Sequence, residues 1–170
     1  MAEHAGAGLI VVGVGRWGKN LAATAHALSA LTAIVEPNAA AVERLLSRCP
    51  GAAAAVRYAD LDSALREHAG CAVVVATPVS THFALAMQAV RAGRAVFVEK
   101  PVCDTLERAQ ELVELARSKG VVLMVDHLLH YSAGHRRLVR LVRAGALGRV
   151  IRVRMSRLNF GTVRTGENVL

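Results

Sequence analysis

Short apolar runs alternate along the chain with longer segments in which apolar residues recur every three or four positions. The runs predict buried strands, and the longer periodicity predicts amphipathic helices. Strands are expected at residues 9–14, 31–36, 55–58, 72–76, 94–98 and 121–125. Helices are expected between them at residues 17–29, 39–48, 60–68, 80–93 and 104–119. This alternation predicts an α/β fold, in which a doubly wound, Rossmann-like parallel sheet carries helices on both faces.

Several residues are expected to set the ends and the buried faces of these helices. Asp60 or Asp62 can cap one helix, and Ser80 can cap the next. In the helix at 104–119, Leu106 and Leu112 are both expected to face the core.

The period of the pattern changes near the C-terminus. Residues 132–145 are typical of a helix, and from 150 to 160 Ile151, Val153 and Met155 alternate with polar residues. This alternation predicts a half-exposed strand of an antiparallel sheet, the first strand of a second α+β domain. We therefore expect a dinucleotide-binding domain at 1–127, followed at 128–170 by a linking helix and the start of a truncated C-terminal substrate domain. The open edge of that strand is expected to pair with a second copy or a complementing chain.

Composition supports the α/β class and adds a charge asymmetry. Hydrophobic residues make up 54% of the chain but aromatic residues only 4%, a balance typical of helices that cover a buried sheet. The net charge is +8, and no acidic residue separates the arginines between His127 and Arg164. Such a stretch can attract nucleic acid, but it lacks interleaved aromatic residues and a recognised reader motif. We expect no nucleic-acid partner, and a solvated face or a surface for an anionic substrate instead.

The sequence also bears on location. No apolar stretch is long enough to span a bilayer, and the first residues lack the basic region of a secretory signal. We therefore expect a cytoplasmic protein with no membrane partner. Cys49, Cys71 and Cys103 share no CxxC spacing, which favours reduced thiols over disulfides or a metal site.

A glycine-rich loop joins the first predicted strand to the first predicted helix. Gly13, Gly15 and Gly18 can provide a tight turn, a close approach to a pyrophosphate and close packing of helix on strand. Arg16 and Trp17 complete the candidate cofactor-binding loop. A structural turn, or a methyltransferase loop that binds an adenosyl group, remains as an alternative.

Glu36 ends the second predicted strand, eighteen positions after Gly18. A carboxylate at this place can accept hydrogen bonds from both hydroxyls of an adenosine ribose, and it would repel a 2′-phosphate. The cofactor is therefore expected to be NAD, with NADP less favoured. Arg16 and Arg44 are the residues that can reverse this preference.

Thr77 and Pro78 close the fourth predicted strand, and His82 lies near the start of the helix after it. Ligands of open α/β sheets bind at this edge, so the three residues can flank the nicotinamide half of the cofactor. His82 can alternatively be a cap or a packing residue.

Glu99, Lys100 and Pro101 follow the fifth predicted strand. The Lys100 ammonium can orient the nicotinamide and donate a hydrogen bond to the reacting oxygen of a substrate, which makes Lys100 the candidate catalytic residue. Pro101 fixes the turn, and Glu99 is included among the cofactor-binding residues. A surface pair of Lys100 and Glu99 is the alternative.

Taken together, these motifs resemble the Gfo/Idh/MocA family of NAD(P)-dependent sugar and polyol oxidoreductases. The matching positions are Gly13, Gly15 and Gly18, then Glu36, then Ala76, Thr77, Pro78 and His82, and finally Glu99, Lys100 and Pro101. The resemblance implies hydride transfer between NAD and a sugar hydroxyl, with Lys100 as a catalytic residue and no metal.

The end of the chain, from Arg157 to Leu170, is similar to the subset of the family that acts on nucleotide-activated or amino sugars. The resemblance implies a sugar or nucleotide-sugar substrate in contact with Arg157 and Asn159, with His127 at its border. It also places an acid/base histidine, in an Asp-x-x-x-His motif, and the usual oligomer interface in a second domain that this chain only begins. Asp126 and His130 have the same spacing, which we attribute to coincidence. The alternative hypothesis is a catalytically inactive module that binds NAD or a partner.

Overall fold

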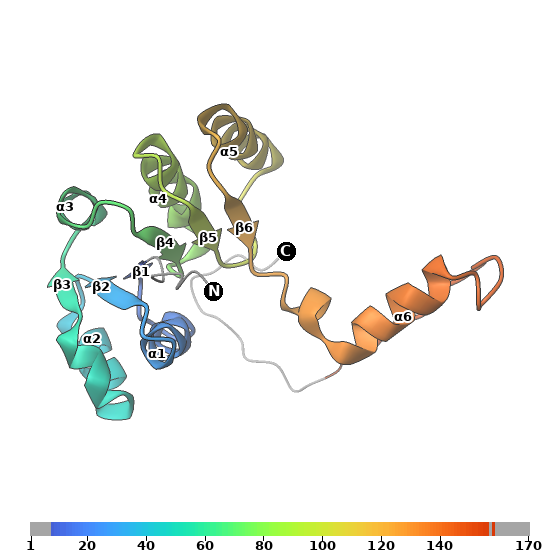
Figure 1. The fold of residues 1–170 in the computed structure, drawn as a ribbon, viewed down its shortest axis with the longest axis horizontal. Helices are drawn as coiled ribbons and strands as arrows, with labels where there is room; N and C mark the ends of the chain where they lie inside the picture. Colours follow the sequence, from blue (N-terminus) through green and yellow to red (C-terminus); the bar gives the residue numbers. More distant parts are fainter. Residues whose placement is uncertain (1–7, 157, 159–170) are drawn as a thin grey trace, which may run out of the picture. The chain divides into compact units, whose positions relative to one another are not determined.

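The computed structural model describes residues 8–156 and 158. The chain divides into two compact units, one up to Asp126 and one from His127 onward. The first unit is built on a six-stranded sheet in the order β3-β2-β1-β4-β5-β6 (Figure 1), in which all neighbours are parallel. The strands are β1 (Leu9–Val12), β2 (Leu31–Val35), β3 (Val56–Tyr58), β4 (Ala72–Val75), β5 (Val96–Val98) and β6 (Leu123–Val125). The helices of this unit are α1 (Gly18–Ala27), α2 (Ala39–Arg48), the 3₁₀ turn η1 (Pro50–Ala54), α3 (Leu61–Glu67), α4 (Val79–Arg91) and α5 (Leu106–Lys119).

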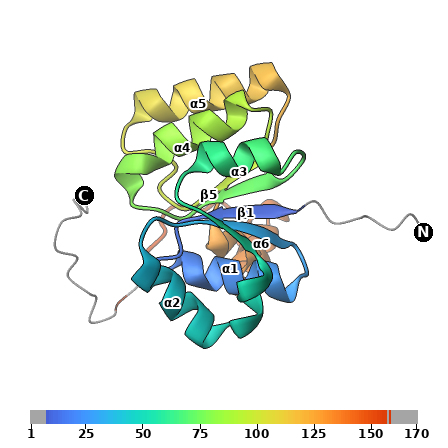
Figure 2. The ribbon, with the colours of Figure 1, turned by 90° about the vertical axis from the view of Figure 1, so that its left-hand side faces the viewer.

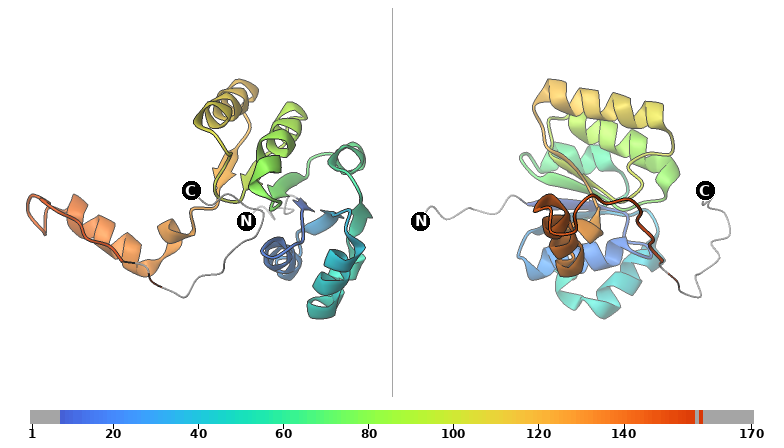
Figure 3. Two further views of the ribbon diagram at one scale, coloured as in Figure 1. Left: turned by 180° about the vertical axis from the view of Figure 1, so that it is seen from behind. Right: turned by 90° about the vertical axis from the view of Figure 1, so that its right-hand side faces the viewer.

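Helices cover both faces of the sheet. Figure 2 shows α3, α4 and α5 on one face and α1 and α2 on the other, and Figure 3 shows the same layers from behind. Ile10 and Val11 are neighbours in β1 and point to opposite faces, yet both are fully buried. Ile10 packs in the cluster that includes Leu112 of α5, and Val11 packs in the cluster that includes Leu45 of α2. Burial on both faces explains why the strands are continuous apolar runs, and the predicted fold class is confirmed.

The strand order positions the candidate site. The chain runs from β1 outward to β2 and β3, then returns to the other side of β1 to form β4, β5 and β6. The direction of winding therefore reverses between β1 and β4. In open α/β sheets, ligands bind outside the carboxyl ends of the strands at this point of reversal.

Two of the expectations about helix residues are wrong, and one is resolved. Asp60 caps α3, where its carboxylate accepts a hydrogen bond of 2.8 Å from the Ser63 amide. Ser80 is not a cap, because α4 already begins at Val79, after Pro78. Leu106 is 68% exposed rather than buried, whereas Leu112 is fully buried. Six residues at about 100° each turn Leu106 roughly 120° away from the direction of Leu112.

The second unit contains the 3₁₀ turn η2 (Leu128–Tyr131) and helix α6 (Ala133–Arg143). The predicted strand at 150–160 is wrong over residues 150–156, which form no strand. Ile151 and Met155 are 87% and 79% exposed, so the alternating pattern is present without a buried face. A strand requires a hydrogen-bonded neighbour, and the described residues provide none here. The open strand edge that was expected to pair with another chain is therefore also absent from residues 150–156.

Among residues 8–156 and 158, no helix combines the length and the apolar character that a bilayer span requires.

Candidate functional site

The three glycines of the β1–α1 loop have different surroundings. Gly13 has φ of +84°, and a Cβ there would lie 2.8 Å from Cγ2 of Thr77. A Cβ on Gly18 would overlap the carbonyl oxygen of Gly13. A Cβ on Gly15, in contrast, would have no atom within 4 Å. Gly13 and Gly18 thus allow close packing inside the protein, while Gly15 faces open space that a ligand can approach.

The start of α1 is suited to an anion. Its N-cap residue is Trp17, whose side chain makes no capping hydrogen bond, and no acidic residue lies in the first turn. The first amide groups of a helix lack partners within the helix, and they carry the positive end of its dipole. The open side of Gly15 therefore adjoins a helix N-terminus, the arrangement that receives the pyrophosphate of a dinucleotide. Trp17 is half-exposed and Arg16 is exposed at the same loop.

Glu36 connects the end of β2 to this loop. Its Oε2 atom accepts a hydrogen bond of 3.0 Å from the Val14 amide, and its Oε1 atom accepts one of 3.0 Å from the Asn38 amide. Each carboxylate oxygen has a further lone pair, so Glu36 can still accept hydrogen bonds from ribose hydroxyls. The bond to Val14 was not predicted, because sequence spacing does not reveal contacts between a carboxylate and a distant main chain.

The loops after β4 and β5 are joined by His82. This side chain is only 2% exposed. Its Nε2 atom lies 2.8 Å from the carbonyl oxygen of Thr77, and its Nδ1 atom lies 2.8 Å from that of Pro101. Thr77 also contacts the position of Gly13, so the loops after β1, β4 and β5 meet at one edge. His82 thus packs between two candidate loops, and its predicted contact with the cofactor stays a prediction.

Lys100 lies on the open side of the same edge. Its side chain is exposed, and its amide donates a hydrogen bond of 3.2 Å to Oε2 of Glu99. The peptide bond between Lys100 and Pro101 is cis. The ammonium group is therefore free of the protein core at the carboxyl end of β5, where a ligand of this edge would be accessible to it.

Glu99 and Asp126 form a pair that the sequence did not indicate. They follow β5 and β6, neighbouring parallel strands in which Val98 is aligned with Val125. Burial, followed by a hydrogen bond and repulsion from the Asp126 carboxyl, raises the pKa of Glu99 to about 7, although the Lys100 amide and ammonium oppose this shift. Oε1 of Glu99 is buried without a donor from the described part of the chain. Because two carboxylates offer no donor to each other, the hydrogen bond between them requires a proton on one. The one signal in the sequence is that Glu99 and Asp126 each directly follow a predicted strand.

Residues 8–127 match the family described as oxidoreductases with an NAD-binding Rossmann fold, Gfo/Idh/MocA. The chain belongs to this family. The predicted resemblance is thereby confirmed, as is NAD as the cofactor that the family binds.

Several relatives of this Gfo/Idh/MocA chain are named for reactions on sugars or sugar derivatives. The chain is 42% identical over 84 residues to 1,5-anhydro-D-fructose reductase from Ensifer adhaerens, covering 49% of this chain and 25% of the relative. It is 34% identical over 121 residues to UDP-N-acetylglucosamine 3-dehydrogenase from Acidithiobacillus ferrooxidans, covering 69% and 36%. The crystal structure of the WlbA dehydrogenase from Bordetella pertussis, in complex with NADH and UDP-GlcNAcA, matches with a TM-score of 0.73 and 27% identity, covering 84% of this chain and 41% of that one. This chain therefore spans a quarter to about two fifths of these relatives.

Three residues of this Gfo/Idh/MocA chain were predicted to contact or border the substrate, namely His127, Arg157 and Asn159. His127 is exposed in the second unit, just before η2. Its ring meets that of His130 edge-on, with 6.0 Å between the ring centroids. Arg157 and Asn159 lie outside the described residues. The predicted substrate contacts of these three residues stay predictions.

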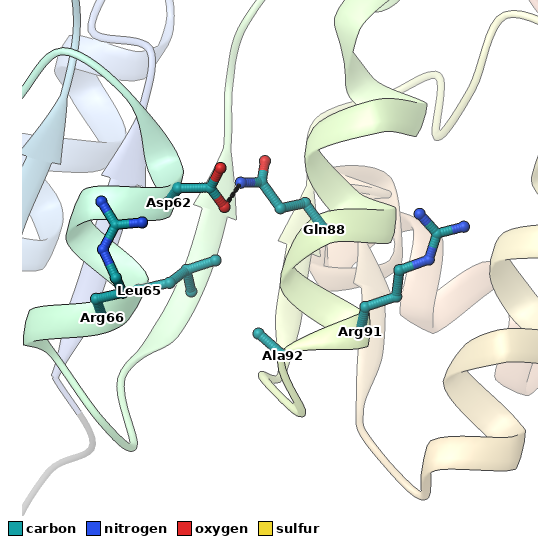
Figure 4. A pocket seen from close by; sticks show the side chains of 6 residues that line it. All are labelled: Asp62, Leu65, Arg66, Gln88, Arg91 and Ala92. Atoms are coloured by element: carbon teal, nitrogen blue, oxygen red, sulfur yellow. Dashed lines mark hydrogen bonds between the residues drawn. The ribbon is translucent and has the colours of Figure 1, made fainter.

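A shallow groove between α3 and α4 is a different feature of the first unit (Figure 4). Its lining residues are Asp62, Leu65, Arg66, Gln88, Arg91 and Ala92. A hydrogen bond from Gln88 to Asp62 crosses it. Since α4 begins at the carboxyl end of β4, the residues in the last turn of α4 lie at the opposite edge of the sheet. The groove contains none of the predicted site residues.

Proposed function

We propose that this chain is the cofactor-binding part of an NAD-dependent oxidoreductase, which transfers hydride between the nicotinamide and a sugar hydroxyl. One observation carries the proposal: the open position at Gly15, the Glu36 carboxylate and the exposed Lys100 all follow strands at one edge of the sheet. This edge contains the point where the winding reverses, and the chain belongs to an NAD-binding family.

Each element of the edge has a proposed role. The amides around Gly15 and the start of α1 bind the pyrophosphate, and Glu36 accepts hydrogen bonds from the adenosine ribose. Arg16, Trp17, Thr77, Pro78, Glu99 and Pro101 line the cofactor, and His82 holds two of these loops. Bound NAD supplies the hydride acceptor at its nicotinamide ring.

Lys100 is the proposed catalytic residue. When the sugar hydroxyl is oxidised, its carbon loses hydride and its oxygen loses a proton, so negative charge develops on that oxygen. The Lys100 ammonium donates a hydrogen bond there and stabilises the charge. The proton passes to a general base, which the family resemblance places in the second domain.

The substrate proposed is a nucleotide sugar. Support comes from the UDP-N-acetylglucosamine 3-dehydrogenase among the relatives and from the run of arginines after His127, which suits an anionic diphosphate. Arg157, Asn159 and His127 are the proposed contacts. We place the reaction in the cytoplasm, in keeping with three free cysteines.

Calorimetric titration of the 170-residue chain with NAD and NADP tests the first step. We expect micromolar binding of NAD and weaker binding of NADP, since Glu36 would repel a 2′-phosphate. Gly15→Asp should fold, because its side chain enters open space, and should weaken NAD binding more than about tenfold by repelling the pyrophosphate.

Gly134→Asp is the matched control. A Cβ at Gly134 would meet only Ser132 Oγ, at 3.9 Å, so this substitution adds the same charge in open space on α6. NAD affinity should be unchanged in this variant. A folded chain that fails to bind NAD, or one whose affinity survives Gly15→Asp, would overturn the proposal.

A further inference from the structure

The hydrogen bonds between β1 and β2 continue one step beyond the strands. Just past the end of β1, the Gly13 amide donates a hydrogen bond of 2.9 Å to the Val35 carbonyl oxygen. The next amide, that of Val14, donates instead to the Glu36 carboxylate, with 3.0 Å between its nitrogen and Oε2. A side chain thus takes the place of a main-chain carbonyl at the point where the strand becomes the β1–α1 loop.

Burial makes this hydrogen bond important for Val14. The residue is only 1% exposed, so water has little access to its amide. Within residues 8–156 and 158, the Glu36 carboxylate is the acceptor that this amide has. Because a buried amide without an acceptor is unfavourable, the loop conformation depends on the carboxylate.

The Glu36 carboxylate is itself held by the segment that follows β2. Its Oε1 atom accepts a hydrogen bond of 3.0 Å from the Asn38 amide, and the Asn38 side chain caps α2. The Glu36 amide donates to the Tyr58 carbonyl oxygen at 3.0 Å. Each carboxylate oxygen therefore bonds a different segment, Oε1 the start of α2 and Oε2 the β1–α1 loop.

The peptide group between Gly13 and Val14 lies between Glu36 and the start of α1. Its N–H donates to Glu36, and its carbonyl oxygen lies so close to Gly18 that a Cβ there would overlap it. Gly13 has φ of +84° and no side chain, so its own conformation restrains this peptide group weakly. The hydrogen bond to Glu36 therefore fixes the direction in which the peptide group faces, immediately before the open position at Gly15.

We propose that Glu36 is a positioning residue for the β1–α1 loop, in which its carboxylate fixes the Gly13–Val14 peptide group and thereby the approach of a diphosphate to Gly15. This role is additional to the hydrogen bonds proposed between Glu36 and the ribose hydroxyls. The inference rests on the proposed function for its effect on a bound ligand, but not for the conformation of the loop.

Amide hydrogen exchange of the ¹⁵N-labelled 170-residue chain, followed by NMR without any ligand, tests the hold on the loop. In the unsubstituted chain, the Gly13 and Val14 amides should both exchange slowly. Glu36→Ala removes the acceptor of Val14 and leaves that of Gly13, so exchange at Val14 should rise at least about tenfold relative to Gly13. Free exchange at Val14 in the unsubstituted chain, or an unchanged ratio in Glu36→Ala, would overturn the proposal.

Glu43→Ala is the matched control, because Glu43 is an exposed acid on α2. It removes the same side-chain atoms and the same charge as Glu36→Ala. The Gly13 and Val14 amides should keep the exchange rates of the unsubstituted chain. The same rise at Val14 in this variant would also count against the proposal, because the effect would then come from the lost charge rather than from the lost hydrogen bond.

Calorimetric titration with ADP and with 2′,3′-dideoxy-ADP distinguishes the loop from the ribose. The dideoxy compound keeps the diphosphate but offers Glu36 no ribose hydroxyl. Glu36→Ala should weaken its binding about fivefold, although the loss of a negative charge alone would favour a diphosphate. ADP should lose more affinity, because its hydroxyl contacts disappear as well. Equal or tighter binding of the dideoxy compound by Glu36→Ala would overturn the effect on the ligand.

The two experiments separate this inference from the proposed function. If the unsubstituted chain binds neither ADP compound, the proposed function fails, and the effect of Glu36 on a ligand fails with it. Hydrogen exchange still decides whether the carboxylate holds the Val14 amide, so the two failures are distinguishable.

Discussion

The pairing of Glu99 with Asp126 predicts that the chain loses stability as the pH rises toward neutrality. The pKa of Glu99 is raised from its ordinary value of 4.5 to about 7, first by burial and then by the Asp126 carboxyl. A group whose pKa is higher in the folded state stabilises the fold below the unfolded-state pKa, and this contribution disappears as the pH rises through the folded-state pKa. The free energy of unfolding should therefore fall between about pH 4.5 and 7.

The size of this effect follows from the difference between the two values. About 2.5 pH units, at about 1.4 kcal/mol each, set an upper limit of roughly 3.5 kcal/mol. Asp126 is only half-buried, and solvent screens its repulsion of Glu99. We therefore expect an effect of about 1–2 kcal/mol across this range.

The free energy of unfolding of the unsubstituted chain and of Glu99→Gln is measured at pH 5, 6, 7 and 8. The assay is urea unfolding followed by far-ultraviolet circular dichroism. The glutamine keeps an oxygen for the Lys100 amide and offers an amide donor to Asp126, so it resembles the protonated acid at every pH. The variant should match the unsubstituted chain at pH 5 and exceed it by about 1–2 kcal/mol at pH 8. Histidine titrations are shared by both proteins and cancel in the difference.

Asp126→Asn provides the second comparison. Removing the neighbouring carboxyl lowers the pKa of Glu99 toward its ordinary value, so the fall in stability between pH 5 and 8 should be smaller than in the unsubstituted chain. A difference between the unsubstituted chain and Glu99→Gln that stays constant from pH 5 to 8 would refute the reasoning, because Glu99 would then titrate alike in both states.

Three further substitutions test the packing and capping that hold the candidate site. Leu112→Ala, in the core under α5, should cost about 2–5 kcal/mol in urea unfolding, since Leu112 is fully buried. Asp60→Ala should lower the urea midpoint, because it removes the N-cap of α3, and Asp60→Asn should restore most of the loss. Gly18→Ala should lower the thermal midpoint markedly, because its Cβ would overlap the Gly13 carbonyl, whereas Gly15→Ala should leave the midpoint nearly unchanged.

Much of the fold could be predicted because its signals are local. Apolar runs, turn residues and the glycine loop specify strands and helices with little help from distant residues, and the parallel sheet follows from alternation of the two. The failures have non-local causes. The alternating pattern around Ile151 forms no strand at residues 150–156, because pairing needs a neighbour that sequence periodicity does not supply. Leu106 is apolar and helical, but only the packing of α5 decides which side is buried.

The candidate site divides in the same way. Gly15, Glu36 and Lys100 were predicted from motif and spacing, because each follows a strand whose carboxyl end must lie at one edge. The contacts of Glu99 and His82 were not predicted. The Asp126 carboxyl beside Glu99, and the carbonyls on either side of His82, are tertiary contacts between segments that share no sequence pattern.

Those missed contacts form a connected series along the edge of the sheet. The Glu36 carboxylate bonds the loop after β1, Gly13 lies against Thr77 after β4, and His82 connects Thr77 to Pro101 after β5. A binding edge held in this way loses less conformational entropy when a ligand binds, and the smaller entropic cost increases the affinity. It also means that a change in one loop displaces the next. Substitutions at contacts remote from the open edge should therefore alter cofactor affinity, even when the residues at that edge are intact.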